Sequence, residues 1–179
     1  DMATVRPSAM VPSVMASAKA VLNEQQIESG VAVIDLGGST TGVAVFEEGD
    51  LQYVGVVPFG GINITNDLAI GLKTNPEIAE KVKLQHASSK ANRDNEGVSV
   101  KHGDEILSFE TSDIDEIVEA RLEEIFDLVN RELKKAGRAG KLPSGVVLVG
   151  GTANLKGIAE FARDHLGVAA SIGKPTGFG

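Results

Sequence analysis

A run of apolar residues that ends in an acid and a glycine pair limits the possible folds more than any other stretch. It spans residues 31–42 (VAVIDLGGSTTG), and its first four residues predict a buried strand that ends at Asp35. Two glycines and three hydroxyl residues follow: Gly37, Gly38, Ser39, Thr40 and Thr41. Glycines let amides approach an anion, hydroxyls donate to it, and an acid can hold a divalent cation through water. The stretch predicts a phosphate-binding turn; a ligand-free hairpin turn is the alternative, because a short glycine turn has low specificity.

A second glycine turn follows the apolar run at residues 146–149 (VVLV). We predict a helix at about 155–166, capped by Asn154 or Thr152, so that the positive end of its dipole lies beside the glycines. An anion would be favoured there, and a tight strand-to-helix turn without a ligand is the alternative. The predicted site residues of this turn are Gly150, Gly151, Thr152 and Asn154.

Composition excludes several classes of protein. The 179 residues, 42% hydrophobic and 23% charged, suffice for one domain or two small lobes. A net charge of -8 argues against a nucleic-acid partner. The chain has no cysteine, which excludes disulfides and thiolate metal sites. It also has no run of about 20 apolar residues that could span a membrane.

Apolar periodicity predicts the elements around the two turns. The phosphate turn becomes the first loop of an antiparallel meander, whereas the common nucleotide-binding loops lead into a helix. Predicted strands are 30–35, 41–46, 51–57, 98–100, 106–109 and 168–172, and predicted helices are 13–22, 63–72, 76–88, 114–136 and 155–166. Residues 23–30 are predicted to be a connector and 87–97 a mobile loop. The predicted helix caps are Ser13, Asn63 or Thr65, Thr74, and residues 111–113.

Glu80 and Lys83 are three residues apart, so they share one face of a predicted helix. A solvated ion pair is the simplest interpretation. With the two glycine turns, however, the pair resembles the actin-like ATPase superfamily, which includes actin, Hsp70 chaperones and sugar kinases. Residues 35–41 resemble its second phosphate motif, and 147–157 resemble its adenosine motif. The pair itself matches residues that contact ribose and adenine in several members.

Within that superfamily the chain most resembles FtsA, the family of bacterial cell-division actin homologues. The matching phrases are residues 56–74 (VVPFGGINITNDLAIGLKT), 79–83 (AEKVK) and 119–126 (EARLEEIF). The resemblance runs from about residue 11 to 175. Val149 departs from it, since the family often has Thr there, and the loop at 87–97 matches no motif.

The resemblance implies an α/β fold: an actin-like, ribonuclease-H-like lobe with a mixed sheet, a three-strand antiparallel meander, flanking helices and a small inserted helical and hairpin subdomain. We expect the second lobe alone, because no first phosphate motif precedes residue 31 and no basic amphipathic helix follows Gly157. The expected division is an extended lead-in at 1–12, a sheet subdomain at 13–75 and 145–179, and an insert at 76–144.

The resemblance also implies ATP and Mg²⁺ as ligands. Asp35 would hold the ion through water, residues 37–41 the phosphates, and Glu80 and Lys83 the sugar or base. With half of the cleft absent, we expect weak nucleotide binding and no activity from this chain, and at most a slow ATPase in a full-length protein.

The partners implied by the resemblance are the FtsZ C-terminal tail and further copies in filaments, at the cytoplasmic face of the membrane at the division site. Membrane contact would use segments absent here. Arg121, Asn130 and Lys134 on the long helix are the predicted tail-binding residues; an Arg121–Glu124 pair is the alternative role for Arg121. Two other assignments stay open: a PilM-like pilus-assembly module and a small-molecule kinase of the same fold.

Overall fold

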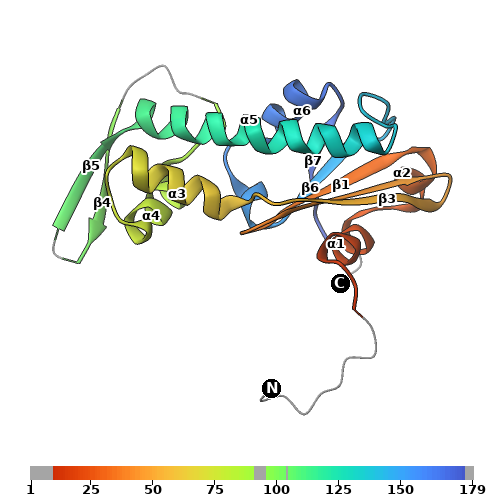
Figure 1. The fold of residues 1–179 in the computed structure, drawn as a ribbon, viewed down its shortest axis with the longest axis horizontal. Helices are drawn as coiled ribbons and strands as arrows, with labels where there is room; N and C mark the ends of the chain where they lie inside the picture. The colour runs from red at the N-terminus through yellow and green to blue at the C-terminus, as the bar shows by residue number, and fades with distance from the viewer. Residues whose placement is uncertain (1–9, 91–95, 104, 176–179) are drawn as a thin grey trace, which may run out of the picture.

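Five strands form one mixed sheet, which lies toward one end of the molecule (Figure 1). The computed structural model describes residues 10–90, 96–103 and 105–175, so most of the predicted lead-in and residues 91–95 of the predicted loop lie outside the described residues. The strand order is β3-β2-β1-β6-β7, with β1 Val31–Leu36, β2 Thr41–Glu47, β3 Asp50–Val57, β6 Val146–Val149 and β7 Ala170–Ile172.

The pairing of these strands confirms the predicted fold class. The strands β1, β2 and β3 pair antiparallel as a meander, whereas β6 pairs parallel with β1, and β7 parallel with β6. The chain between β3 and β6 forms the other end of the molecule before it returns to the sheet (Figure 1). The carboxyl ends of β1 and β6 therefore meet at one edge, where loops from both strands can build a site.

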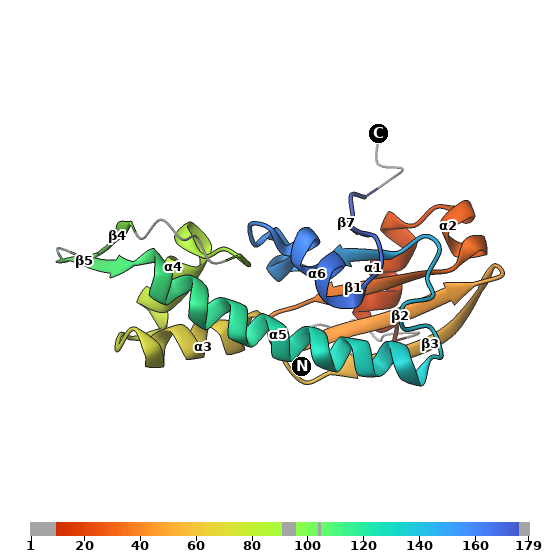
Figure 2. The same cartoon turned by 90° about the horizontal axis from the view of Figure 1, so that it is seen from above.

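Helices cover both faces of the sheet (Figures 1 and 2). The helices α1 (Ser13–Val21) and α2 (Glu24–Ser29) lie on one face, and α5 (Thr111–Lys135) and α6 (Ile158–Leu166) lie on the other. Side chains alternate between the two cores: Val33 packs with α1, and Ile34 packs in the core that contains α5 and α6. Both are fully buried, which explains the continuous apolar run in this strand.

The other end holds two helices, α3 (Gly61–Gly71) and α4 (Pro76–His86), and a hairpin of β4 (Gly97–His102) and β5 (Glu105–Glu110). The 25-residue helix α5 joins this end to the sheet (Figure 1). Its apolar stripe is buried along its length. At its far end the Tyr53 hydroxyl donates to Glu132 at 2.5 Å, and Arg138 pairs with Glu47. No helix among the described residues is long and apolar enough to cross a bilayer.

Two predictions at the start of the chain are wrong. Residues 23–30 include the helix α2, which Asn23 and Gln26 cap reciprocally with hydrogen bonds of 2.8 and 3.0 Å. This capping box is visible in the sequence, but the short helix has too few apolar positions to show a period. Ser13 is not a cap, because α1 begins at Ser13 itself and the capping position is Pro12, without a side-chain bond.

Several predicted helix starts also differ from the structure. The helix α3 begins at Gly61, and Asn63 contributes by accepting a hydrogen bond of 2.9 Å from the Gly60 amide. Asn75, not Thr74, caps α4, with Pro76 in the first turn as predicted. The helix α5 begins at Thr111, so residues 111–113 lie in its first turn. Each error is a shift of a few residues at a helix end, where several polar side chains compete to cap.

Candidate functional site

The two glycine turns lie side by side at the carboxyl ends of β1 and β6. Asp35 is paired with Val149 across the parallel strands. A Cβ on Gly150 would lie 2.5 Å from the Leu36 carbonyl oxygen and 2.7 Å from Oδ1 of Asp35. The Thr152 hydroxyl donates to the Gly37 carbonyl at 3.1 Å. The acid and the two glycine pairs therefore converge at one edge of the sheet.

The first turn presents free hydrogen-bond donors. Gly38, Ser39 and Thr40 are exposed, and among the described residues their amides and the two hydroxyls have no acceptor. The Gly37 amide, by contrast, closes the turn on the Thr40 carbonyl at 3.0 Å. Exposed amides and hydroxyls on one tight turn can bind the oxygens of a phosphate.

Thr41 differs from its neighbours. It is fully buried at the start of β2, and its hydroxyl donates to the Phe59 carbonyl at 2.9 Å. This bond fixes the end of the meander against the residues that lead into α3. The structure therefore places the Thr41 hydroxyl in the protein interior, apart from the exposed donors of the turn.

A third glycine pair, Gly60 and Gly61, which the sequence analysis names only within the family phrase at 56–74, supports the first turn. The Gly61 and Ile62 amides donate to the carbonyls of Gly37 and Gly38 at 2.9 and 2.8 Å. A Cβ on Gly60 would lie 2.6 Å from both of these carbonyl oxygens. The start of α3 therefore holds the turn by its carbonyls and leaves the amides on the outer side free. The Gly-Gly step after Pro58-Phe59 was the available sequence signal.

Glu80 and Lys83 form the predicted pair on α4, but they do more than pair with each other. The Lys83 ammonium donates to Glu80 at 2.7 Å, to the Thr65 hydroxyl at 2.7 Å and to the Gly61 carbonyl at 3.0 Å. Burial alone would raise the pKa of Glu80, but hydrogen bonds from Lys83 and Thr65 outweigh it, so the pKa is lowered. Glu80 is therefore an anion at neutral pH.

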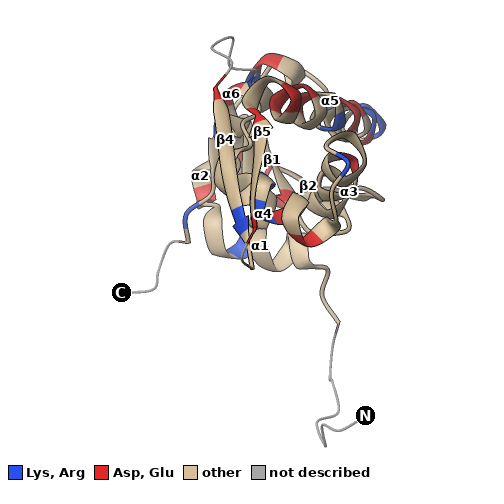
Figure 3. Cartoon of the chain, turned by 90° about the vertical axis from the view of Figure 1, so that its left-hand side faces the viewer, with Lys and Arg blue, Asp and Glu red and all other residues tan. Residues whose placement is uncertain are grey.

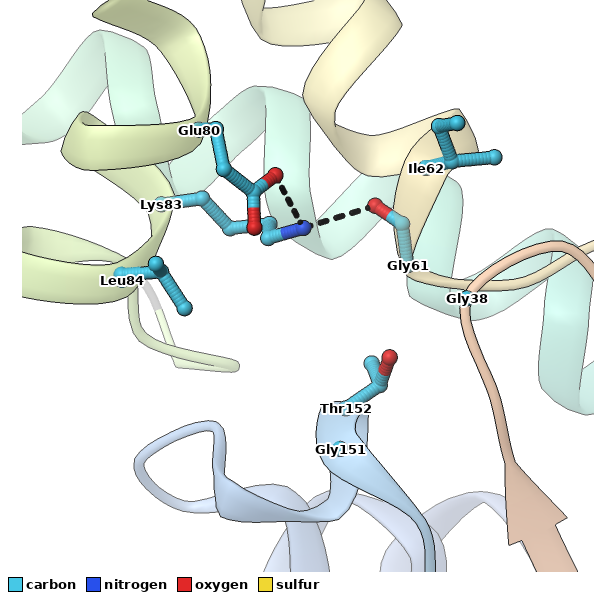
Figure 4. Close-up of a pocket in the computed structure, with 8 residues that line it drawn as sticks. All are labelled: Gly38, Gly61, Ile62, Glu80, Lys83, Leu84, Gly151 and Thr152. Atoms are coloured by element: carbon cyan, nitrogen blue, oxygen red, sulfur yellow. Dashed lines mark hydrogen bonds and ion pairs between the residues drawn. The ribbon is translucent and has the colours of Figure 1, made fainter. Parts of the chain in front are cut away.

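These groups surround one cavity of about 390 Å³ (Figure 4). In the figure the α4 pair faces the start of α3 on one side and the β6 turn on the other. The lining residues are Gly38, Gly61, Ile62, Glu80, Lys83, Leu84, Gly151 and Thr152. A neighbouring cavity of about 330 Å³ shares Lys83, Leu84, Gly151 and Thr152 and extends to Asn154, whose side chain donates to the Gly151 carbonyl at 3.1 Å. Together the cavities make a groove with polar glycine turns and an apolar wall at Leu84.

The predicted helix after the second turn is wrong in its start. A 3-10 helix covers Gly151–Asn154, and α6 begins only at Ile158, after Gly157 in the left-handed region at φ 81°. The first turn of α6 therefore begins after a 3-10 helix and Gly157 and does not directly follow the glycine pair as predicted. The helix end that reaches the site is that of α3, whose first amides contact the turn of Gly37 and Gly38.

Asp35 is the carboxylate that the β1 turn offers to a metal ion. Among the residues that the structure describes, no three acidic, histidine or cysteine side chains gather as a metal site. Asp35 is partly buried, with Oδ2 3.5 Å from the Ser17 hydroxyl of α1. A single carboxylate beside phosphate donors fits Mg²⁺, which keeps most of its waters and shares its ligands with the nucleotide.

The three predicted tail-binding residues do not share one face of α5. Asn130 lies nine residues after Arg121, about two and a half turns, so their side chains leave opposite sides of the helix; Lys134 lies on the Asn130 side. Arg121 also has partners within the chain. It contacts Asp67 at 2.5 and 3.0 Å and also pairs with Glu124, and its guanidinium lies 5.4 Å from the Phe59 ring centre. The alternative role of Arg121, pairing within its helix, is present.

Arg121 borders a second groove of about 390 Å³, between α3 and α5. Its lining is Asp67, Ile70, Gly71, Ile117, Ala120, Arg121 and Glu124. Ile70 is 76% exposed there, so the groove presents an apolar side chain to solvent. Figure 3 shows acidic residues along α5 and basic residues at its carboxyl end, so charge along this helix changes sign.

Solved structures confirm the fold. MreB5 of Spiroplasma citri, solved with ADP, matches with a TM-score of 0.74 at 21% identity, over 90% of this chain and 53% of that one. The PilM–PilN type IV pilus biogenesis complex matches with a TM-score of 0.64 at 20% identity, over 85% of this chain and 38% of that one. The chain has the actin-like ATPase fold, as predicted.

Sequence comparison identifies the family. Cell division protein FtsA of Pseudomonas aeruginosa is 36% identical over 165 residues, which is 90% of this chain and 40% of the relative. FtsA of Bacillus subtilis is 38% identical over 169 residues, which is 92% of this chain and 38% of the relative. The chain thus spans about two fifths of the length of these relatives. The family model described as "Cell division protein FtsA" matches residues 32–178, and the chain belongs to the FtsA family.

Proposed function

We propose that the chain is the nucleotide-binding second lobe of an FtsA-type cell-division scaffold. Asp35 holds Mg²⁺ through water, and Gly37, Gly38, Ser39 and Thr40 bind phosphate oxygens. Gly150, Gly151, Thr152 and Asn154 lie along the adenosine, and Glu80 faces the sugar. The bound ion neutralises phosphate charge, while the chain's own residues position the nucleotide and exclude water from one side of it.

One observation carries this proposal: three segments far apart in the sequence line a single cavity. The β1 turn contributes Gly38, the β6 turn contributes Gly151 and Thr152, and α4 contributes Glu80 and Lys83. This arrangement puts anion donors, a close backbone surface and a carboxylate within reach of one ligand. The solved MreB5 structure of the same fold, which contains ADP, supports the assignment to a nucleotide.

A titration of the ¹⁵N-labelled chain with Mg·ATP, followed by NMR, tests the site directly. We expect amide shifts at Gly38, Ser39, Thr40 and Gly151, with an affinity weaker than micromolar. We expect low affinity because the chain covers only about 40% of the length of an FtsA relative, and each charge-assisted hydrogen bond that it does not itself supply costs about 1.5–3 kcal/mol. Shifts scattered over the surface, with none at these turns, would reject the site.

Glycine variants supply the matched control. No atom lies within 4 Å of a Cβ placed on Gly38 or on Gly97. Gly38→Ala should therefore fold normally but obstruct a phosphate, and Gly97→Ala on the distant hairpin should fold normally and bind Mg·ATP as the wild type does. Equal binding by both variants would remove the β1 turn from the proposal.

We further propose that the groove between α3 and α5 takes the C-terminal tail of FtsZ, an acidic and apolar peptide. The exposed Ile70 supports this by offering an apolar contact in the groove. Arg121 would bind an acidic group of the tail in exchange for Glu124, the more exposed of its two acidic partners. Arg121→Glu should weaken binding of a synthetic tail peptide at least about tenfold, the loss of one charged hydrogen bond. Arg131→Glu makes the same charge change at an exposed position of the same helix. This control variant should bind the tail peptide as tightly as the wild type does.

The wider assignment follows the family. The proposed division is a sheet subdomain at 13–75 and 145–179 with an insert at 76–144, and the complete protein assembles into actin-like filaments on the cytoplasmic face of the membrane at the division site. Filament formation is supported by the likeness to a MamK double helical filament, at a TM-score of 0.68. Sedimentation of the full-length gene product with ATP and anionic vesicles tests both points. Failure to sediment with vesicles, or to form polymers with ATP, would reject them.

A further inference from the structure

Thr65 is a buried polar residue, 4% exposed, that lies behind the nucleotide cavity rather than in its wall. It is in the second turn of α3, and its hydroxyl lies between the two charged groups of α4. The hydroxyl accepts a hydrogen bond of 2.7 Å from Lys83. It also lies within hydrogen-bond distance of the Glu80 carboxylate and, at 3.1 Å, of the Gly61 carbonyl. It has one proton to donate, and the charged carboxylate is the stronger acceptor.

The Lys83 ammonium is saturated by the protein. It has three N–H donors, and its three acceptors are Glu80, Thr65 and the Gly61 carbonyl. Its side chain is 12% exposed, against 42% for that of Glu80. Lys83 is therefore held as a fixed positive charge in the cavity wall, with all three of its donors used by the protein.

Glu80 is held by one oxygen only. Both Lys83 and Thr65 donate to Oε2, and no described residue donates to Oε1. The carboxylate is partly exposed and lines the cavity. A carboxylate fixed at one oxygen, with the other open to a cavity, is suited to accept hydrogen bonds from hydroxyl groups of a ligand.

We propose that Thr65 is a positioning residue of this site, whose hydroxyl fixes Glu80 so that Oε1 accepts hydrogen bonds from a ribose. The inference rests on the proposed nucleotide function and deepens it: it makes the site select ribonucleotides through Glu80, with Thr65 and Lys83 as its support. Without the Thr65 hydroxyl, Glu80 keeps only its contact with Lys83 and can rotate away from the sugar. Triphosphate contacts at the β1 turn are unaffected.

The test compares Thr65→Val, which removes the hydroxyl at constant shape, with Thr65→Ser, which restores it. Thr74→Val is the control, because no described residue bonds to the Thr74 hydroxyl.

The first measurement needs no nucleotide: the pKa of the Glu80 carboxyl is followed by ¹³C NMR. It should rise in Thr65→Val, return in Thr65→Ser and stay constant in Thr74→Val, since a hydrogen bond that lowers the pKa is lost only in the first.

The second measurement is the affinity for ATP, 2′-deoxy-ATP and 3′-deoxy-ATP, by NMR titration of the same variants. The wild type should prefer ATP over at least one deoxy form by about tenfold, and Thr65→Val should reduce this preference to about twofold or less, with Thr65→Ser restoring it. Thr65→Ala provides a second hydroxyl-free variant if the valine does not fold.

Each other result has a distinct meaning. An unchanged Glu80 pKa, or a preference for ATP that survives in Thr65→Val, overturns the role of Thr65 while the nucleotide site stands. Absence of nucleotide-dependent shifts in the wild type overturns the proposed function, and the positioning role falls with it. A merely structural role for Thr65 would reduce binding of all three nucleotides equally, and this outcome also rejects the inference.

Discussion

The Thr152 hydroxyl donates a hydrogen bond of 3.1 Å to the carbonyl of Gly37, a residue 115 positions earlier in the chain. The bond joins the two glycine turns directly. Thr152→Val should lower the free energy of unfolding by about 1 kcal/mol, the usual value for one hydrogen bond, because Gly37 keeps its bond from Gly61. Urea denaturation measures it, with Thr152→Ser as the variant that retains the bond. Equal losses in both variants would show that the methyl group, not the hydroxyl, matters.

Alanine substitution should affect the free energy of unfolding strongly at the first glycine after β6 and only slightly at the second. Gly150 has φ 92°, and its Cβ would lie 2.5 Å from a backbone oxygen, whereas a Cβ on Gly151 meets no atom within 4 Å. We expect Gly150→Ala to cost about 2 kcal/mol or more in the free energy of unfolding. Gly151→Ala should change it by less than about 0.5 kcal/mol. Thermal or urea unfolding of the pair decides this, and similar stabilities would contradict the geometry of the turn.

The Arg121–Asp67 pair should contribute measurably to stability, because both side chains are largely covered, at 20% and 27% exposed, and the contact is bidentate. A double-mutant cycle with alanine at each position should give a coupling energy of about 1 kcal/mol that weakens with added salt. The Lys90–Asp164 pair is the control, since its 3.8 Å contact is more than half exposed. A coupling as small as that of the control would reject a structural role for the pair.

The stability contributed by the contact between Tyr53 and Glu132 should depend on pH, with an alkaline and an acid limit. A hydrogen bond to Glu132, together with burial, raises the pKa of Tyr53 above 10.0, so its stabilisation is complete below pH 10.0 and is lost as the pH rises through the raised value. The pKa of Glu132 is lowered, first by Lys135 and then by Tyr53, so its contribution is present above 4.5 and is lost as the pH falls through the lowered value.

The alkaline limit can be read from one residue. Tyr53 is the only tyrosine in the sequence, so an ultraviolet absorbance titration reports its phenol alone. Glu132→Gln should bring the pKa of Tyr53 back toward its ordinary value, because the negative acceptor is removed. Glu123→Gln, an exposed position on the same helix, should leave the titration unchanged. A titration curve that is the same in Glu132→Gln and in the wild type would contradict the contact.

The sequence was sufficient where the signal is local and repeated. The apolar run of β1 and the stripe of α5 predicted buried elements, and the meander followed from short turns. The two glycine turns were paired through the resemblance to actin-like ATPases, and the parallel pairing of β1 and β6 that brings them together appears only in the structure.

The remainder depends on contacts that no local pattern shows. The support of the β1 turn by Gly60 and Gly61 needs the position of α3, which only packing determines. Thr65 was considered as a helix cap, because threonine often has that role, and its place between Glu80 and Lys83 depends on how α3 and α4 pack. Helix geometry alone predicts that the side chains of Arg121 and Asn130 leave opposite sides of α5, because nine residues make about two and a half turns. The family phrase carries residue types and no information on these directions.

The helix α5 has neither proline nor glycine within its 25 residues, so it lacks the usual causes of a bend. One end packs against α3 and α4 beside the cavity, and the other is tied to β2 and β3 through Glu47 and Tyr53. A straight helix held at both ends joins the cavity to the far strands through one rigid element, so the two ends of the molecule cannot change their spacing without changing its contacts.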